Sequence, residues 1–267
     1  MRIATFNING IGARLPRLLE WLDTFKPDVA CLQEIKTQTE TFPRLEFETR
    51  GYECAVQGQK GFNGVAILSR IGLEDVSIGL PHLAGNDDET DEQSRFIEAT
   101  VGGDVRVACL YLPNGNPQPG PKFDYKLAWM RRLIAHAKTE LAKERPYVLT
   151  GDYNVCPTDE DVWDVAKMAN DALTQPESRA LFHELLWLGF TDAIRAVQPQ
   201  GHAFTYWDYQ AAAWSKDWGL RIDHMLLSPQ AADRMVTAGI DRRPRGQEKA
   251  SDHTPVWCEL KDGQTTA

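Results

Sequence analysis

The chain has 267 residues, of which 42% are hydrophobic and 25% are charged, so it can bury a sizeable core and is not intrinsically disordered. Its formal net charge of −9 argues against a general nucleic-acid binder, because such proteins tend to be basic. No stretch approaches the roughly 18 consecutive apolar residues that a membrane helix needs, which excludes a membrane-spanning protein.

The start of the chain and its cysteines indicate the cellular compartment in which the protein acts. Residues 1–3 lead directly into a strand-like run, without an apolar signal segment. The five cysteines are an odd number, and no two of them form a CxxC pair. We interpret them as small buried thiols in a reducing compartment, and we expect a cytoplasmic protein.

The first half of the chain alternates strand-like and helix-like segments. Residues 2–6 form a strand-like run, and leucines at 15, 18, 19 and 22 then recur at helical spacing. We expect further strands at 29–32, in two short runs within 51–69, at 95–100 and at 105–112. The acidic run at 85–92 is expected to be a solvated loop. A long Pro/Gly-rich loop at 113–121, of a kind that can close over a ligand, precedes a helix expected at 123–141, whose Arg131 and Arg132 are expected to face water.

The second half is organised around an apolar run at 147–150 that ends in Gly151-Asp152-Tyr153-Asn154. Helices are expected at 159–166 and 177–188, and strands at 225–227 and 256–260. Between them, residues 202–218 hold a dense aromatic set. No internal repeat and no linker divides the chain, so we expect a single α/β domain over residues 1–267.

Polar side chains stand at the ends of successive strands. They are Asn7, Glu34, Tyr111, Asp152 with Asn154, Asp223, and Asp252 with His253. Each alone has a simple reading as a turn. Open α/β sheets keep their sites at the carboxyl ends of their strands, however, and crowded carboxylates repel unless a cation lies among them. The set therefore indicates a hard, oxygen-preferring metal, Mg²⁺ or Mn²⁺, and no cluster of His and Cys suits zinc.

Six motifs carry a family resemblance. They are Phe6-Asn7-Ile8-Asn9-Gly10, Leu32-Gln33-Glu34, Tyr111-Leu112-Pro113-Asn114-Gly115, Gly151-Asp152-Tyr153-Asn154, Arg221-Ile222-Asp223 and Ser251-Asp252-His253. In this order they resemble the exodeoxyribonuclease III family of apurinic/apyrimidinic (AP) endonucleases, within the endonuclease–exonuclease–phosphatase superfamily. The resemblance implies a four-layer α/β sandwich, in which two mixed β-sheets pack face to face with helices outside.

The resemblance also implies roles for the polar residues. Glu34 would be the main metal ligand, with Asp252 and Asn7 nearby. Asp152, steadied by Asn154, would orient or deprotonate the attacking water, and His253, paired with Asp223, would contact a phosphate oxygen. Tyr111 would act as an acid or hydrogen-bond donor to the phosphate or the leaving oxygen. Further substrate contacts are expected from Asn9, Lys36 and Asn114.

The aromatic segment has two readings. It can be core packing beneath a loop, or it can line a slot for a sugar that has lost its base and has swung out of the duplex. Relatives build such a slot from the positions of Tyr206, Trp207, Leu220 and Ile222, and Trp218 is a neighbour. One position departs from the family: relatives commonly carry an arginine that holds a DNA phosphate where this chain has Gly12. The basic segment 242–245 and Lys249 can compensate, or can simply be solvated.

The resemblance implies a Mg²⁺-dependent DNA-repair phosphodiesterase, in which Mn²⁺ can substitute. It would cut 5′ to abasic sites in duplex DNA and would have 3′-5′ exonuclease and 3′-end-cleaning activity, acting as a monomer. The acidic charge fits such an enzyme, because acidic ligands bind the cation and the cation meets the phosphate. One alternative is a phosphatase or phospholipid esterase, although relatives of that type tend to carry His where Tyr111 stands. Another is a binding protein on an inactive scaffold.

The remaining histidines are expected to be structural or on the surface: His82, His136, His183, His202 and His224.

Overall fold

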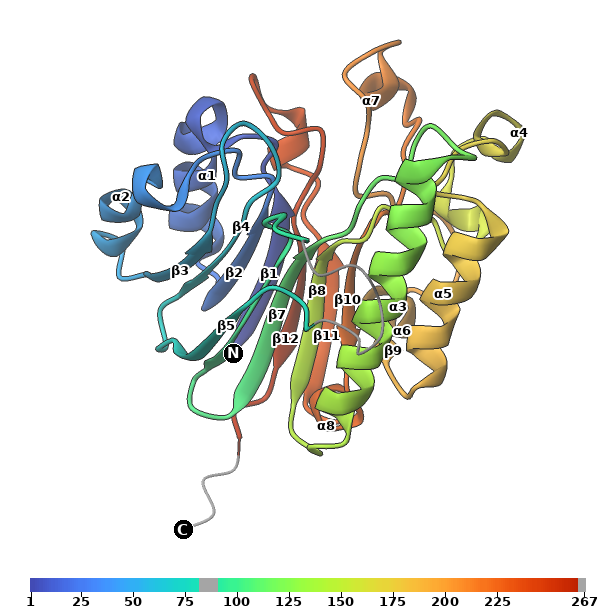
Figure 1. The fold of residues 1–267 in the computed structure, drawn as a ribbon. Coiled ribbons are helices and arrows are strands. Elements are labelled where there is room, and N and C mark those ends of the chain that lie inside the picture. Colours follow the sequence, from blue (N-terminus) through green and yellow to red (C-terminus); the bar gives the residue numbers. More distant parts are fainter. Residues whose placement is uncertain (82–90, 264–267) are drawn as a thin grey trace.

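The fold consists of two six-stranded sheets that face each other (Figure 1), seen in a computed structural model that describes residues 1–81 and 91–263. The strand orders are β11-β12-β1-β2-β4-β3 and β5-β6-β7-β8-β10-β9. Both sheets mix parallel and antiparallel pairs. The strands are β1 Arg2–Asn7, β2 Val29–Gln33, β3 Glu53–Gln57, β4 Val65–Ser69, β5 Glu74–Ile78, β6 Phe96–Val101, β7 Val105–Tyr111, β8 Tyr147–Asp152, β9 Thr191–Asp192, β10 Asp223–Leu227, β11 Met235–Ile240 and β12 Val256–Leu260.

The helices lie on the outer faces of the two sheets (Figure 1). On the first sheet these are α1 (Ile11–Phe25) and α2 (Arg44–Glu48), and on the second α3 (Pro121–Leu141) and α5 (Pro176–Trp187). The expected four-layer α/β sandwich is therefore confirmed. The shorter helical elements are η1 Thr39–Thr41, η2 Asp159–Asp161, α4 Val165–Met168, α6 Ala193–Val197, α7 Ala213–Lys216, α8 Pro229–Ala232 and η3 Pro244–Gly246.

The main core fills the space between the sheets. It contains Ile3, Val29 and Ile67 from the first sheet and Val107, Val148 and Met225 from the second. Because helices cover the outer faces as well, the central strands are buried on both sides, and all five residues of β2 are buried. Burying one such side chain contributes about 1.5–3 kcal/mol to the free energy of folding. The sandwich is therefore a rigid support for the polar residues at the ends of its strands.

Two expectations about local structure were wrong. The helix expected at 159–166 is split into η2 and α4, because Val162 between them is extended and pairs with Leu220. Arg132 does not face water: its side chain is 3% exposed, and its guanidinium lies 2.8 Å from a carboxylate oxygen of Asp91. Residues 85–90 of the acidic run lie outside the described residues, as does His82.

The pairing of the strands brings their polar ends to one rim. Parallel pairing puts Asn7 opposite Gln33 and Tyr111 opposite Asp152, and antiparallel pairing puts Asp223 opposite Asp152. Gly151 allows this closeness, since a Cβ atom there would lie 2.0 Å from the Leu110 carbonyl oxygen. The strand ends therefore define one place for a site.

Candidate active site

The residues that follow β1, β2 and β8 have an unusual backbone conformation. Asn9, Glu34, Lys36 and Asn154 have φ angles of 47°, 50°, 51° and 47°. Non-glycine residues adopt such left-handed values at a cost, and they cluster at functional sites. The first two loops are bonded to each other, since the Gly10 N–H donates to the Glu34 carbonyl at 2.7 Å. These loops aim polar side chains at one part of the rim.

Asn7 joins two carboxylates at the centre of this rim. Its buried Nδ2 group donates to Glu34 Oε1 and to Asp152 Oδ2, each at 2.9 Å. Its Oδ1 atom accepts from the Asn9 N–H at 3.0 Å. One neutral amide thus holds two carboxylates close together.

Lys36 and Asn9 extend the cluster to a third carboxylate. Lys36 Nζ lies 2.8 Å from Glu34 Oε2 and donates to Asn9 Oδ1. The Nδ2 group of Asn9 in turn donates to Asp252 Oδ1 at 3.0 Å. Burial acts to raise the pKa of Glu34, but the hydrogen bonds from Lys36 and Asn7 outweigh it and lower that pKa. Glu34 is therefore ionised at neutral pH.

His253 is held as a cation by Asp223. The two side chains meet at 2.8 Å between Nδ1 and Oδ2, and the Thr205 hydroxyl donates to the same oxygen at 2.7 Å. Burial acts against a charged imidazole, but the Asp223 carboxylate, with Asp152 and Asp252 nearby, raises the pKa of His253 to about 10. Nε2 lies 3.8 Å from Asp152 Oδ2 and can donate a proton in a hydrogen bond toward the cavity.

Asp152 differs from the other carboxylates in its proton affinity. Burial raises its pKa to about 7, although the charge of His253 acts in the opposite direction. Its Oδ1 atom accepts from the Asn154 N–H at 2.9 Å, which fixes the orientation of the carboxylate. A carboxylate with a pKa near neutrality is suited to take a proton from water.

Asn154 and Asn114 form a polar pair beside Asp152. Asn114 Nδ2 donates to Asn154 Oδ1 at 3.1 Å, and Asn154 Nδ2 donates to the Leu112 carbonyl at 2.9 Å. Beneath them, buried Lys126 donates from Nζ to the backbone carbonyls of Asn114 and Asn154, at 3.1 Å and 2.5 Å. The loops after β7 and β8 are thereby tied together.

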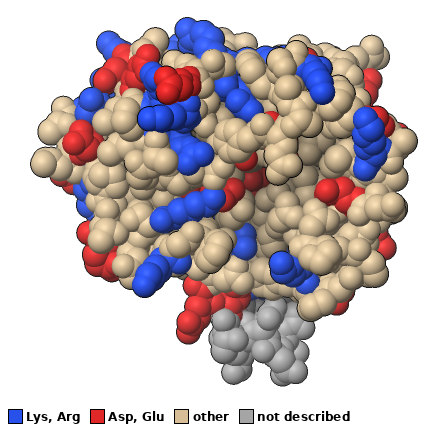
Figure 2. Space-filling model, turned by 90° about the horizontal axis from the view of Figure 1, so that it is seen from above, with Lys and Arg blue, Asp and Glu red and all other residues tan. Residues whose placement is uncertain are grey.

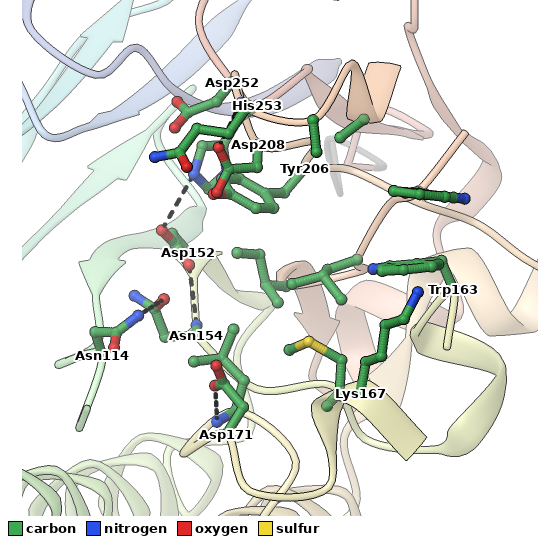
Figure 3. Close-up of a pocket in the computed structure, with 18 of the residues that line it drawn as sticks. Asn114, Asp152, Asn154, Trp163, Lys167, Asp171, Tyr206, Asp208, Asp252 and His253 are labelled. Atoms are coloured by element: carbon green, nitrogen blue, oxygen red, sulfur yellow. Dashed lines mark hydrogen bonds and ion pairs between the residues drawn. The ribbon is translucent and has the colours of Figure 1, made fainter. Parts of the chain in front are cut away.

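A pocket with a cavity volume of about 580 Å³ opens beside this cluster. Glu34, Asp152, Asp252 and His253 line one end of it. Figure 3 shows Asp152 and His253 facing each other there, with Trp163 and Lys167 on the far side. The expected slot residues Tyr206, Leu220 and Ile222 also line the pocket.

Trp207 is the expected slot residue that the structure does not bring to the pocket. It is fully buried, and its Nε1 group donates to Asp217 at 2.9 Å. It follows Tyr206 directly in an extended segment, so the two side chains point to opposite faces. Tyr206 faces the pocket, and Trp207 packs edge-on against Trp214 behind it.

Tyr111 lines the pocket next to the carboxylates. Burial, together with the charges of Glu34 and Asp152, raises its pKa well above its usual value, so the phenol keeps its proton. The Arg95 guanidinium lies 4.9 Å from the centre of its ring. Tyr111 is thus a hydrogen-bond donor aimed at the cluster.

The donor set fits a hard divalent cation. Ligand atoms of Glu34, Asp152 and His253 all lie within 4.8 Å of one another. His253 is a poor ligand in this setting, because metals bind the neutral imidazole and Asp223 keeps the ring charged. The carboxylate oxygens that remain are the ligands that Mg²⁺ and Mn²⁺ prefer. Asp252 lies outside that compact group and is joined to it through Asn9.

The pocket and its supports include residues that escaped the sequence analysis, among them Lys126, Trp163 and Lys167. Lys126 had a signal, because it shares the spacing of the apolar stripe through Met130 and Leu133 and so had to lie on the buried face of α3. Trp163 and Lys167 had no such signal in the sequence, since nothing in their local pattern marks them as neighbours of Trp218. The histidines behave as expected where described: His224 is fully buried and bonded to the Val155 carbonyl.

Figure 2 shows the rim face-on, with Lys and Arg side chains on both sides of a hollow that contains acidic side chains. Within residues 1–81 and 91–263, no helix combines the length and apolar character needed to cross a membrane.

The profile of the Endonuclease/Exonuclease/phosphatase family matches residues 4–253, and the chain belongs to this family. The matched range contains every residue of the cluster described above. The expected family assignment is thereby confirmed.

Individual relatives indicate which activities occur among family members similar to this chain. Exodeoxyribonuclease III of Haemophilus influenzae is 35% identical over 98% of this chain and all of its own length. A structure of a Neisseria 3′ phosphatase bound to a product DNA hairpin superposes with a TM-score of 0.92, at 38% identity, over 98% of this chain and 99% of that one. An AP endonuclease of Archaeoglobus fulgidus has the same TM-score, at 36% identity, over 98% of this chain and all of its own.

Proposed function

We propose that this protein is a divalent-metal-dependent DNA-repair phosphodiesterase. It cuts 5′ to abasic sites in duplex DNA, and it trims 3′ ends as a 3′-5′ exonuclease that also removes blocking groups. The relatives named above are an exodeoxyribonuclease, a 3′ phosphatase and an AP endonuclease, and each shares nearly the full length of this chain.

One observation carries the proposal. Asn7, Glu34 and Asp152 form a hydrogen-bonded cluster, and the ion pair of His253 with Asp223 adjoins it at the head of a partly apolar pocket. A carboxylate with a pKa near 7, a fixed imidazolium and an apolar slot together match the needs of phosphodiester hydrolysis at a baseless sugar.

Asp152 takes a proton from the attacking water. The water oxygen bonds to phosphorus, the bond from phosphorus to the O3′ oxygen breaks, and the leaving oxygen receives a proton. Tyr111, which remains protonated, lies in the same pocket and is the donor for that oxygen. Asn154 keeps the Asp152 carboxylate oriented through its backbone N–H.

Cationic and amide groups bind the phosphate. His253 donates from Nε2, and Asp223 keeps the ring charged throughout the reaction. Lys36 offers Nζ, and Asn9 and Asn114 offer their Nδ2 groups, as further donors near the same end of the pocket. Such preoriented donors stabilise the charge that develops in the transition state.

Glu34 and Asp252 hold the cation, which we propose to be Mg²⁺ with Mn²⁺ as a substitute, and Asn7 orients Glu34. When bound, the cation supplies Lewis-acid stabilisation of the phosphate oxygens. Tyr206, Leu220 and Ile222 receive the sugar that lacks a base. The protein is proposed to act in the cytoplasm, as a monomer with one domain.

The test is cleavage of a duplex that carries a tetrahydrofuran abasic analogue. We expect cleavage with Mg²⁺ or Mn²⁺, and we expect EDTA to abolish it. Asp152→Asn removes the proton acceptor and is expected to lower kcat by at least about 10²-fold. Asp233→Asn, which alters an exposed carboxylate next to α8, is the matched control and should behave like the wild type.

Failure of the wild type to cut this duplex with either metal ion would count against the proposed function. Equal activity of Asp152→Asn and the wild type would remove Asp152 from its proposed role.

A further inference from the structure

The pocket is larger than the expected sugar slot. Its volume of about 580 Å³ lies in the range of about 300–1,000 Å³ that pockets for whole small ligands occupy. Tyr206, Leu220 and Ile222 line only part of it. Beyond them, Trp163 and Lys167 lie on the side of the pocket away from Asp152 and His253 (Figure 3).

The far end of the pocket is an aromatic stack. The rings of Trp163 and Trp218 are 4.3 Å apart between centroids and 12° from parallel, and both rings are partly exposed to the pocket. Nothing in the proposed chemistry at Asp152 uses these two side chains.

The stack is held rigidly by the backbone below it. The Trp163 N–H donates to the Gly219 carbonyl at 3.1 Å, and the neighbouring residues Val162 and Leu220 form a β-bridge. The adjacent Arg221 side chain is buried and paired with Asp161 at 2.6 Å and with Asp192 at 2.7 Å. The platform is therefore preorganised and does not have to form on binding.

Cationic side chains accompany the stack. Lys167 Nζ lies 4.3 Å from the ring centre of Trp163 and 5.0 Å from that of Trp218, and Lys216 Nζ lies 4.1 Å from that of Trp218. Lys167 also lies 3.4 Å from Asp164, but both lysine side chains are on exposed residues and can reorient. Aromatic faces with neighbouring cations are the means by which proteins bind single-stranded nucleotides.

We propose that the Trp163–Trp218 end of the pocket is a nucleobase subsite. The base of an intact 3′-terminal nucleotide stacks on this pair while its 5′-phosphate lies at Asp152 and His253. This inference rests on the proposed phosphodiesterase function and deepens its exonuclease part: it assigns the place in the pocket where the base of the 3′-terminal nucleotide lies once that base has left the duplex stack.

The chemistry is the same hydrolysis. Water attacks the phosphorus of the terminal nucleotide, the bond to the O3′ of the preceding nucleotide breaks, and a nucleoside 5′-monophosphate is released. Unstacking a terminal base costs least where that base is mismatched. The enzyme is therefore expected to remove mismatched 3′ nucleotides faster than paired ones.

The experiment compares two duplexes, one with a mismatched, base-bearing 3′ terminus and one with an internal tetrahydrofuran site. Trp218→Leu is expected to lower the ratio of kcat/KM for the first to kcat/KM for the second by about 10-fold, which is within the range measured for lost base stacking. Trp218→Phe should restore most of the ratio, because a phenyl ring still stacks. Trp187→Leu, at an indole that is 81% exposed on α5 and outside the pocket, is the matched control.

A second measurement uses inhibition of tetrahydrofuran cleavage. Deoxyadenosine monophosphate is expected to inhibit the wild type at lower concentration than deoxyribose 5-phosphate, and Trp218→Leu should remove that difference.

Equal losses on both duplexes would assign Trp218 a structural role and overturn the subsite. The subsite would also be overturned if Trp218→Leu changed kcat/KM on neither duplex. The same holds for a wild type that cuts the tetrahydrofuran duplex but leaves the mismatched 3′ terminus intact. A wild type that cuts neither duplex contradicts the proposed function itself, so the two failures are distinguishable.

Discussion

Lys126 is a buried lysine that forms no ion pair within the described residues. Its Nζ group donates to the carbonyls of Asn114 and Asn154, and its stem passes so close to Gly115 that a Cβ there would lie 2.7 Å from Lys126 Cδ. Burial lowers its pKa to about 7. The side chain therefore positions two catalytic loops at a cost in desolvation.

Replacement of Lys126 by methionine tests that positioning. The thioether keeps the length of the stem but cannot donate to the two carbonyls, so the carboxamides of Asn114 and Asn154 lose their fixed orientation. We expect kcat on the tetrahydrofuran duplex to fall on the order of 10²-fold, since displacements of about 1 Å have such effects. Lys122→Met, at an exposed position on the same helix, is the control and should leave kcat unchanged.

The same variant changes the pH dependence of stability. The folded-state pKa of Lys126 is about 7, against 10.5 for a free lysine, so the unfolded chain binds a proton that the folded chain lacks. Stability contributed by this group therefore rises with pH above about 7. Urea unfolding between about pH 7 and about pH 8.5 should show a rise in the wild type that is smaller in Lys126→Met. Parallel pH curves for the two proteins would contradict the assignment.

At the scale of elements, a buried charge cluster attaches α3 to the second sheet. Glu98 on β6 lies 2.7 Å from the Arg106 guanidinium on β7 and 3.0 Å from His136 on α3. Burial acts to raise the pKa of Glu98, but His136 and Arg106 outweigh it and hold that pKa at about 2. All three side chains are at most 9% exposed, so the charges of Glu98 and Arg106 are compensated by each other and not by water.

Glu98→Gln is expected to lower the free energy of unfolding by about 3 kcal/mol, because it leaves the buried Arg106 without a counter-charge. Urea unfolding at neutral pH measures the change. Glu74→Gln, on the exposed edge strand β5, is the matched control and should lie within about 0.5 kcal/mol of the wild type. A loss as small as the control's would mean that Glu98 is not needed to hold α3.

The elements that the sequence predicted are those with a buried face. The long helices α1, α3 and α5 and the central strands have clear apolar periods. The strands β5, β9 and β11 were missed, and all three lie at sheet edges. All five residues of β5 are exposed, so the alternation that reports a half-buried strand is absent.

At the scale of the whole molecule, charge is distributed unevenly. The net charge is −9, yet Lys and Arg side chains gather around the site face (Figure 2). A second hollow of about 340 Å³ is lined by Arg14, Arg245 and Lys249 and, among the residues that the structure describes, by no acidic one. It adjoins the first turn of α1, next to Gly12, where the family resemblance leads us to expect an arginine, and we expect this hollow to bind a DNA phosphate in its place.

The double variant Arg14→Ala/Lys249→Ala is expected to bind duplex DNA more weakly and with less salt dependence. Each lost phosphate contact should reduce the slope of log K against log[salt] by about 1. Titration of labelled duplex at several salt concentrations measures the slope. Lys261→Ala, after the last strand, is the matched control. An unchanged slope in the double variant would mean that this hollow faces no phosphate.

The sequence by itself determined the α/β class and the polar residues at the strand ends, and the resemblance of its six motifs to a known family implied the sandwich fold and the family assignment. This was possible because apolar period and strand-end position are local properties, and because Glu34, Asp152 and His253 each stand in a motif of consecutive residues. The tertiary structure decided which of these side chains touch, such as the two carboxylates that share Asn7 Nδ2.

Only the tertiary structure determined which residues line the far end of the pocket and which contacts hold them in place. It turned Trp207 away from the pocket and brought Trp163 to Trp218, 55 positions later in the chain. Contacts of this kind depend on a bridge between Val162 and Leu220 and on the buried pairs of Arg221. No local pattern encodes them, because their energy comes from partners that only the folded chain brings together.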